Sequence, residues 1–146
     1  MGGLRSKIFV VMKDCVFCKI AAGEIAAEKI WEDEKHLAFL GIFPRFPGMT
    51  VVATKKHLES YIYQSMDDTG LSDLHVFAKK VAKMIDQSLG SMCCIQVMEG
   101  FDVNHAHLKL FPVYEGKNYG IEFEGDKKAS EEELKKVAEK IRSTIS

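Results

Sequence analysis

Near residue 105 of the chain, His105, His107 and Lys109 alternate with small or apolar residues. If the segment 105–111 forms a β-strand, successive side chains point to opposite faces, so these three polar groups share one face about 7 Å apart. A neutral imidazole acts as a nucleophile or a metal ligand, and a lysine ammonium stabilises negative charge. The spacing therefore predicts a reactive face, although a half-exposed strand without chemistry shows the same alternation.

A second group of reactive side chains lies near the N-terminus, where Cys15 and Cys18 form a C-x-x-C motif. The chain holds four cysteines, too few for a disulfide scaffold in a protein of this size. In a reducing compartment such a motif indicates metal binding or redox chemistry. Cys93 and Cys94 are adjacent in an expected strand, so one is predicted to face the core and the other the opposite side.

The composition is that of one globular domain. The 146 residues are 47% hydrophobic and 28% charged, which excludes a disordered or fibrous chain. A formal net charge of −1 leaves no basic surplus, so we expect neither nucleic acid nor an anionic membrane as an obligatory partner. The apolar run at 8–12 is too short for a transmembrane segment or a signal peptide core, which favours a domain of the cytosol or of an organelle matrix. Of these two locations we expect the cytoplasmic one. We expect a single domain at 8–143 and a flexible N-terminus at 1–7.

The reactive residues must be positioned by a mixture of strands and helices. Apolar residues recur every three or four positions over 70–89, and Gly90 is a typical helix stop. Ser130 and Glu133 form a capping box that begins a last helix. Strands are expected at 28–33, 35–42, 50–54, 93–98 and 105–111, the first two as a hairpin. Strands and helices in this order favour an α+β fold with helices packed on an antiparallel sheet.

Five segments of the chain, in this order, resemble the histidine-triad (HIT) family, whose signature strand alternates three histidines with apolar residues. The matching segments are 15–25 with the C-x-x-C motif, 31–40, 47–57 with its final two lysines and histidine, 98–100 and 103–109. Lys109 occupies the place of the third histidine. The resemblance covers most of the chain and depends on the order and spacing of all five segments.

The resemblance implies a two-layer α+β domain that binds a nucleoside monophosphate and usually forms a homodimer through a continuous sheet. It also implies transfer of a nucleotidyl group, from a nucleoside phosphoramidate or a dinucleoside polyphosphate, through a covalent histidine intermediate. By position His107 would be the catalytic nucleophile, and Lys109 would either aid catalysis with its charge or merely solvate a strand end. The residues that match the nucleotide-binding base pocket, and that plain core packing explains equally well, are Phe17, Ile20, Phe39 and Ile42.

Several positions depart from the family pattern around the expected pocket. Gly41 stands where the family usually has an acidic residue that accepts hydrogen bonds from both ribose hydroxyls. Loss of such a charged acceptor costs about 1.5–3 kcal/mol, or roughly tenfold to a hundredfold in affinity. Met49 and Met98 replace a histidine and an asparagine, and Phe101 with Asp102 stands in for a longer polar segment.

Cys15, Cys18, His57 and His105 together form the pattern C-x-x-C…H…H, which suits a closed tetrahedral zinc site. The zinc-bearing branch of the HIT family has a similar set of ligands. Such an ion would fasten the N-terminal segment to the sheet and stabilise the fold, with no open position for catalysis. A Cys15–Cys18 disulfide or two buried thiols are the competing interpretations.

The N-terminus carries one further pattern. Gly2 and Ser6 fit the short motif for N-myristoylation, and Arg5 and Lys7 would add weak attraction to an anionic membrane. A single acyl chain would anchor the protein only reversibly.

Two functions are therefore expected. The first is a nucleotidyl hydrolase or transferase with His107 as its nucleophile. The alternative is a catalytically impaired, zinc-stabilised dimeric binding module that keeps the fold but not the hydrolysis. The retained histidine favours the enzyme, whereas Gly41, Met98 and Asp102 favour the binding module.

Overall fold

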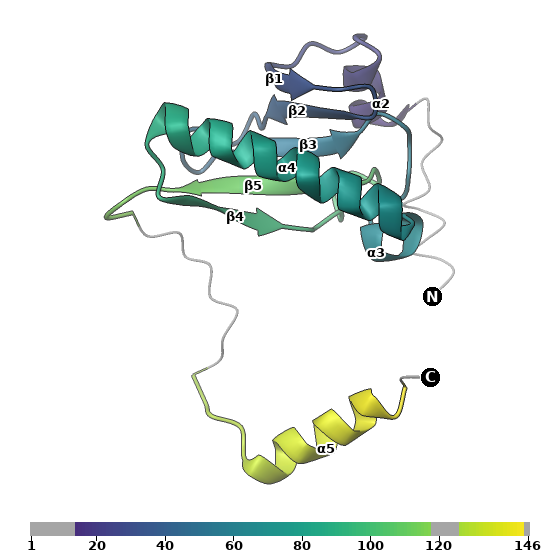
Figure 1. The fold of residues 1–146 in the computed structure, drawn as a ribbon, viewed down its shortest axis with the longest axis vertical. Coiled ribbons are helices and arrows are strands. Elements are labelled where there is room, and N and C mark those ends of the chain that lie inside the picture. The colour runs from purple at the N-terminus through teal and green to yellow at the C-terminus, as the bar shows by residue number, and fades with distance from the viewer. Residues whose placement is uncertain (1–13, 118–125, 145–146) are drawn as a thin grey trace.

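The computed structural model describes residues 14–117 and 126–144 (Figure 1). Its helices and strands are α2 (Val16–Ala21), β1 (Lys29–Glu32), β2 (His36–Leu40), β3 (Thr50–Thr54), α3 (Ile62–Ser65), α4 (Asp68–Leu89), β4 (Cys93–Val97), β5 (His107–Val113) and α5 (Glu131–Arg142). The N-terminus expected at 1–7, and with it the acylation motif at Gly2, lies outside the described residues. None of the described helices combines the length and the apolar character that a bilayer crossing requires.

In the described residues the strands form one five-stranded sheet in the order β1-β2-β3-β5-β4, and every neighbouring pair is antiparallel. The expected hairpin is β1 and β2, and β3 occupies the expected range 50–54. The α+β fold with helices on an antiparallel sheet is therefore confirmed. Its central strands β2 and β3 are buried on both faces, and β1 and β4 form the two edges.

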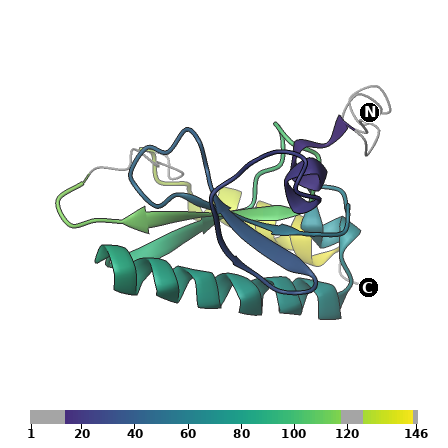
Figure 2. The same ribbon diagram turned by 90° about the horizontal axis from the view of Figure 1, so that it is seen from above.

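The two faces of the sheet carry different layers (Figure 2). The long helix α4 covers one face, where its apolar stripe packs on Ala38, Val52 and Leu108. The short helix α2 lies on the opposite face, where Phe17 and Ile20 pack with the neighbouring β2 and β3 side chains. Because side chains alternate along a strand, β5 turns Leu108 towards α4 and both His107 and Lys109 towards the other face.

Helix α4 begins two residues earlier than the periodicity of its apolar residues predicts. Asp67 is its N-cap, and the Asp67 carboxylate accepts a hydrogen bond of 2.7 Å from the Gly70 backbone N–H. At the other end Gly90 adopts φ 71°, a left-handed conformation that suits glycine and ends the helix where expected. The first turn is polar, so the spacing of apolar residues alone does not reveal it.

Strand β5 differs from the expected range 105–111. The ladder begins at His107, because the Ala106 N–H instead donates to the Leu58 carbonyl at 2.8 Å, outside the sheet. The strand continues through Pro112 to Val113 beside β4 alone, because β3 begins at Thr50, opposite Leu110. The missing N–H of Pro112 therefore interrupts no pairing with β3. His105 therefore lies on the segment leading into the strand rather than in it.

Helix α5 begins at the predicted capping box. The Ser130 hydroxyl accepts from the Glu133 N–H at 3.1 Å, and the Glu133 carboxylate accepts from the Ser130 N–H at 2.8 Å. The apolar stripe of Leu134, Val137 and Ile141 is exposed along this helix. The helices α2 and α3 span 6 and 4 residues, too short for a periodic pattern to predict them.

Replacing Gly48 by alanine will lower the free energy of unfolding by about 2–4 kcal/mol. Gly48 adopts φ +97°, and an added Cβ would lie 2.6 Å from the Leu89 Cδ1 and 3.1 Å from the Pro112 Cγ. Gly90→Ala is the matched control, because φ is +71° there but the added Cβ meets no atom within 4 Å, which leaves a backbone cost of about 1 kcal/mol. Urea denaturation measures both variants, and equal losses would contradict the packing argument.

Candidate functional site

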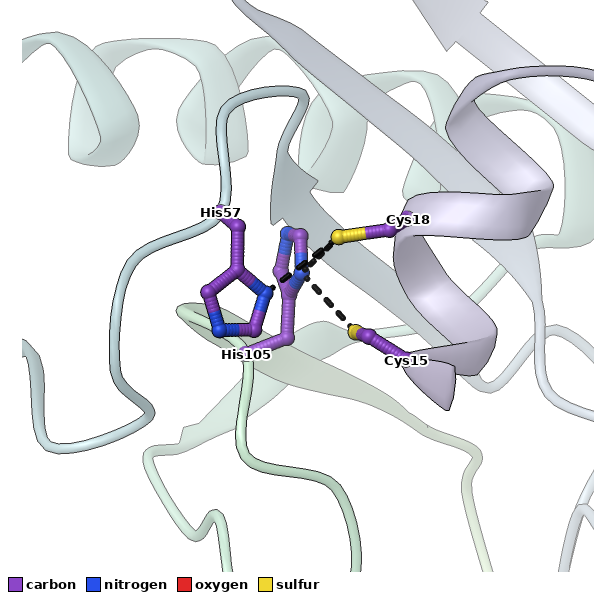
Figure 3. A group of neighbouring side chains, drawn as sticks. All are labelled: Cys15, Cys18, His57 and His105. Atoms are coloured by element: carbon purple, nitrogen blue, oxygen red, sulfur yellow. Dashed lines mark hydrogen bonds between the residues drawn. The ribbon is translucent and has the colours of Figure 1, made fainter. Parts of the chain in front are cut away.

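The structure brings together the four side chains that the sequence singles out as metal ligands (Figure 3). Cys15 and Cys18 come from the start of α2, His57 follows β3, and His105 precedes β5. The Sγ of Cys15 lies 3.3 Å from the His105 Nδ1, and the Sγ of Cys18 lies 3.2 Å from the His57 Nδ1 and 3.4 Å from the His105 Nδ1. One potential ligand atom from each residue lies within 4.8 Å of all the others.

This cluster fits a metal ion. Tetrahedral coordination by sulfur and nitrogen places ligand atoms roughly 3.5 Å apart, close to the distances observed here. The His105 Nε2–H donates to the Thr54 carbonyl at 2.6 Å, which leaves the Nδ1 lone pair directed at the two sulfurs. Cys15 and Cys18 are not joined by a disulfide. The described cluster of two cysteines and two histidines is therefore able to hold a metal ion.

Burial sets the protonation of these groups. Desolvation lowers the pKa of His105 to about 4, so its imidazole is neutral and able to act as a ligand at neutral pH. Desolvation, followed by the hydrogen bond and the charge of Cys15, raises the pKa of the Cys18 thiol to about 11. A bound cation favours the thiolate, so metal binding at this cluster would release protons.

His107 is held in one orientation on β5. Its side chain is only 2% exposed, and its Nδ1–H donates to the His105 carbonyl at 2.5 Å. A ring nitrogen that donates to a carbonyl carries the proton, so the Nε2 has the free lone pair. Desolvation is the main cause that lowers the pKa of His107, which keeps the ring neutral. The Phe17 ring packs edge-on against it with centroids 5.0 Å apart.

Lys109 lies on the same face of β5 and has a partner that the sequence did not indicate. Its Nζ forms an ion pair with the Glu99 Oε2 at 3.0 Å. Partial burial alone would raise the pKa of Glu99, but the hydrogen bonds from Lys109 and the Phe101 N–H outweigh it and lower that pKa. The charge of Lys109 lowers the pKa of His107, and the charges of Glu99 and Asp102 raise it. The His107 face is therefore charged on one side and apolar on the other.

The residues expected to line a base pocket occupy two different environments. Phe17, Ile20 and Phe39 are buried, and the Phe17 and Phe39 rings pack edge-on at 5.3 Å. Ile42 is 84% exposed on the connection between β2 and β3. The structure thus brings three of the four together in one cluster, in which Phe17 contacts the ring of His107, and leaves Ile42 on the surface.

Two of the departures from the family pattern are neighbours. A Cβ added at Gly41 would overlap the terminal methyl group and sulfur of Met49, so the thioether fills the space beside this glycine. Met98 packs against the core beneath α4. Asp102 is exposed, and its charge acts on the ring of His107.

The sequence assigns no role to His36 and His75, because neither has another candidate ligand or catalytic residue at a characteristic spacing. The structure shows what His36 contacts. His36 is buried against the Phe77 ring and its Nδ1–H donates to the Asp33 carboxylate at 3.0 Å. An aspartate three residues before a histidine at a hairpin turn is the signal that could have predicted this contact. His36 also lines a cavity of about 530 Å³ with Thr54 and Asp67 among other residues, on which His107 does not border.

Sequence and structure comparisons place the chain among known proteins. Residues 22–116 match the HIT domain family. An uncharacterized HIT-like protein of Methanocaldococcus jannaschii is 39% identical over 116 residues, which cover 75% of this chain and 86% of that protein. The adenosine 5'-monophosphoramidase of Schizosaccharomyces pombe is 31% identical over 139 residues, which cover 90% of this chain and 98% of that protein. A crystal structure from Streptococcus mutans superposes with a TM-score of 0.79 at 31% identity, covering 92% of this chain and 87% of the other.

Proposed function

The chain belongs to the HIT domain family, and on that premise we propose that it is a nucleotide-binding hydrolase or transferase that acts through a covalent His107-nucleotidyl intermediate. The observation that carries this proposal is the orientation of His107. Its Nδ1–H is engaged by the His105 carbonyl, its ring is neutral, and its Nε2 lone pair is left for an electrophile.

The reaction proceeds in two steps on the same nitrogen. The Nε2 lone pair attacks the α-phosphorus of a nucleotide, and the bond from phosphorus to the leaving group breaks. The leaving group departs with that electron pair and takes up a proton from water. Water or another acceptor then attacks the phosphorus and gives up its proton to the solvent. The bond between the phosphorus and Nε2 breaks, its electron pair returns to Nε2, and the nucleotide leaves a neutral imidazole. Phe17, packed against the ring, and the carbonyl of His105 hold the nucleophile in place throughout.

Lys109 is the second catalytic residue in this proposal. Negative charge develops on the phosphoryl oxygens during both steps, and an ammonium on the same face of β5 stabilises it. Since Lys109 is partly buried and paired, its position is fixed more tightly than that of a surface lysine. Lysine is a point charge, so it supplies electrostatic stabilisation without the acceptor that a neutral histidine offers.

A nucleoside phosphoramidate is the substrate class that we favour, with a dinucleoside polyphosphate second. The similarity to a relative named as an adenosine 5'-monophosphoramidase supports this order. Phe17, Ile20, Phe39 and Ile42 are the proposed base-binding residues. For the exposed Ile42 this role requires that the bound base covers it, because it lies apart from the other three.

The alternative is the dimeric binding module without hydrolysis. Met49 beside Gly41 favours it, because a thioether fills the space where a side chain at position 41 would start and accepts no strong hydrogen bond from a hydroxyl. In this alternative the chain binds a nucleotide weakly or serves as an interaction surface. Retention of a buried, oriented His107 favours the enzyme.

We propose zinc as the ion of the four-residue cluster, in a structural role. Two thiolates and two imidazoles form a closed tetrahedral set that leaves no position for water or substrate. Cys15 and Cys18 would hold the start of α2 through the ion to His57 and His105. The ion would supply stability at the edge of the His107 site, and the chemistry remains with the side chains of β5.

We propose further that the chain forms a cytoplasmic homodimer. In the described sheet β4 is an edge strand, and antiparallel pairing with a second β4 would extend the sheet across both copies. Neither nucleic acid nor a membrane is an obligatory partner in this proposal. Acylation at Gly2, if it occurs, would give only reversible membrane attachment.

Hydrolysis of a panel of adenosine and guanosine phosphoramidates and dinucleoside polyphosphates tests the enzyme proposal. The panel is assayed on protein whose metal content and folding have been measured. Turnover of at least one phosphoramidate above the rate in buffer is the expected result. Folded, metal-loaded protein that leaves every substrate intact would contradict the enzyme and support the binding module.

A further inference from the structure

Lys109, on the His107 face of β5, and the loop at 98–104 together carry three charged side chains. The Lys109 ammonium is 3.0 Å from the Glu99 Oε2, and Asp102 lies three residues further along the same loop. Each of these charges acts on the ring of His107. Their sum is one negative charge, although the proposed reaction draws a phosphate anion to this place. The arrangement therefore needs a physical reason beyond the attraction of anions.

Glu99 is fixed in the loop rather than free to move away. Its second oxygen, Oε1, accepts a hydrogen bond of 2.8 Å from the Phe101 N–H, so both carboxylate oxygens are engaged. The loop itself is anchored, because the Asn104 Oδ1 accepts from the Ser60 N–H at 3.0 Å. A Cβ at Gly100 would overlap the Ser60 side chain, which indicates how closely the two segments approach. A phosphate that reaches Lys109 must therefore share the ammonium with a carboxylate that stays in place.

We propose that Glu99 is a specificity-determining residue that competes with the ligand for Lys109 and so disfavours a phosphate with two negative charges relative to one with a single charge. The negative charge of Asp102 in the same loop acts in the same direction. This inference rests on the proposed function and names its substrate class more closely. A phosphoramidate or a phosphodiester has one negative charge at the reacting phosphorus. The nucleoside monophosphate released by hydrolysis has close to two at about pH 7.5, because its second pKa is about 6.

The expected effect follows from the charge balance of the site. With Lys109, Glu99 and Asp102 the fixed charge is −1, and without the Glu99 charge it is zero. Removing the Glu99 charge makes the binding free energy of the ligand more favourable by a similar amount for each negative charge that the ligand carries. The binding free energy of the dianion should therefore improve about twice as much as that of the monoanion. For partly exposed charges about 7 Å apart in a screened medium, the dianion should gain affinity by roughly threefold to tenfold. Rejection of the dianion would speed product release.

Isothermal titration calorimetry at about pH 7.5 tests this with two probes, adenosine 5′-monophosphate and its phosphate methyl ester, which differ by one charge. We expect Glu99→Gln to bind the monophosphate roughly threefold to tenfold more tightly than wild type, and to bind the methyl ester with a clearly smaller gain. Glu139→Gln, on the exposed face of α5, makes the same change in net charge and should alter neither affinity. Asp102→Asn, at an exposed position, should shift the ratio of the two affinities in the same direction.

If Glu99 had only a structural role, Glu99→Gln would bind both probes more weakly than wild type and by the same factor. That result would overturn the proposal. Failure of the folded wild type and the folded variant to bind either probe at millimolar concentration would also overturn it. If Glu99→Gln does not fold, the ratio measured on Asp102→Asn decides, and an unchanged ratio overturns the proposal. Because the measurement is of binding, it is separate from turnover: loss of His107-dependent hydrolysis would defeat the enzyme proposal and leave this ratio intact.

Discussion

Replacement of His107 by alanine will lower kcat for a nucleoside phosphoramidate by at least about a thousandfold, because it removes the only atom proposed to bond to phosphorus. The remaining rate would come from substrate binding and from Lys109 alone. Since His107 is buried, alanine also leaves a cavity beside Phe17. His107→Gln fills more of that space and should be equally inactive. The measurement is steady-state hydrolysis, with folding checked by circular dichroism.

His75→Ala is the control for this prediction. His75 lies on α4, on the face of the sheet opposite His107, where its Nδ1 lies 3.4 Å from the Gln96 side-chain amide. The variant should keep the wild-type kcat. Comparable rates in wild type, His107→Ala and His107→Gln would mean that any observed hydrolysis does not proceed through this histidine.

Loss of one cysteine of the metal cluster will have the largest effect on stability. We expect the purified wild-type protein to hold about one zinc per chain and Cys18→Ser to hold much less, because a serine hydroxyl is a poor zinc ligand at neutral pH. Without the ion α2 loses its attachment to His57 and His105, and the free energy of unfolding should fall by about 2–5 kcal/mol. Metal analysis and thermal unfolding, each with and without a chelator, measure the two effects.

Cys93→Ser is the matched control for the metal prediction. Cys93 is an exposed cysteine of β4 outside the cluster, so its replacement should leave the zinc content and the melting temperature unchanged. A chelator should destabilise this control as much as the wild type and leave Cys18→Ser unaffected. A wild-type protein free of metal, with the melting temperature of Cys18→Ser, would contradict the proposed zinc site.

The elements with strong local patterns were predictable from the sequence. Four of the five residues at 50–54 are β-branched, and the side chains on both faces of this strand are buried. The strand therefore has the bounds expected from the sequence. The apolar stripe of α4 and the capping box of α5 likewise predicted those helices. The sequence misplaced His105, because the alternation of polar and apolar residues includes it although the strand begins only at His107.

The composition of the metal cluster was predictable because cysteine and histidine are few and their chemistry is specific. The partner of Lys109 was not, since Glu99 is ten residues away on a loop whose path no periodic pattern describes. The same holds for Met49 beside Gly41, a contact that depends on how two strands are joined. Ile42 matched a pocket residue in spacing, but the loop that carries it turns its side chain into solvent.

The measurement that tests the central claim most directly is the intact mass of the protein quenched with acid-free denaturant during turnover of an adenosine phosphoramidate. We predict a fraction of the wild-type chain heavier by one adenylyl group, located on His107 by peptide mapping, and no such species in His107→Gln. Steady hydrolysis with no adduct in the wild type, or an adduct on another residue, would contradict the covalent mechanism.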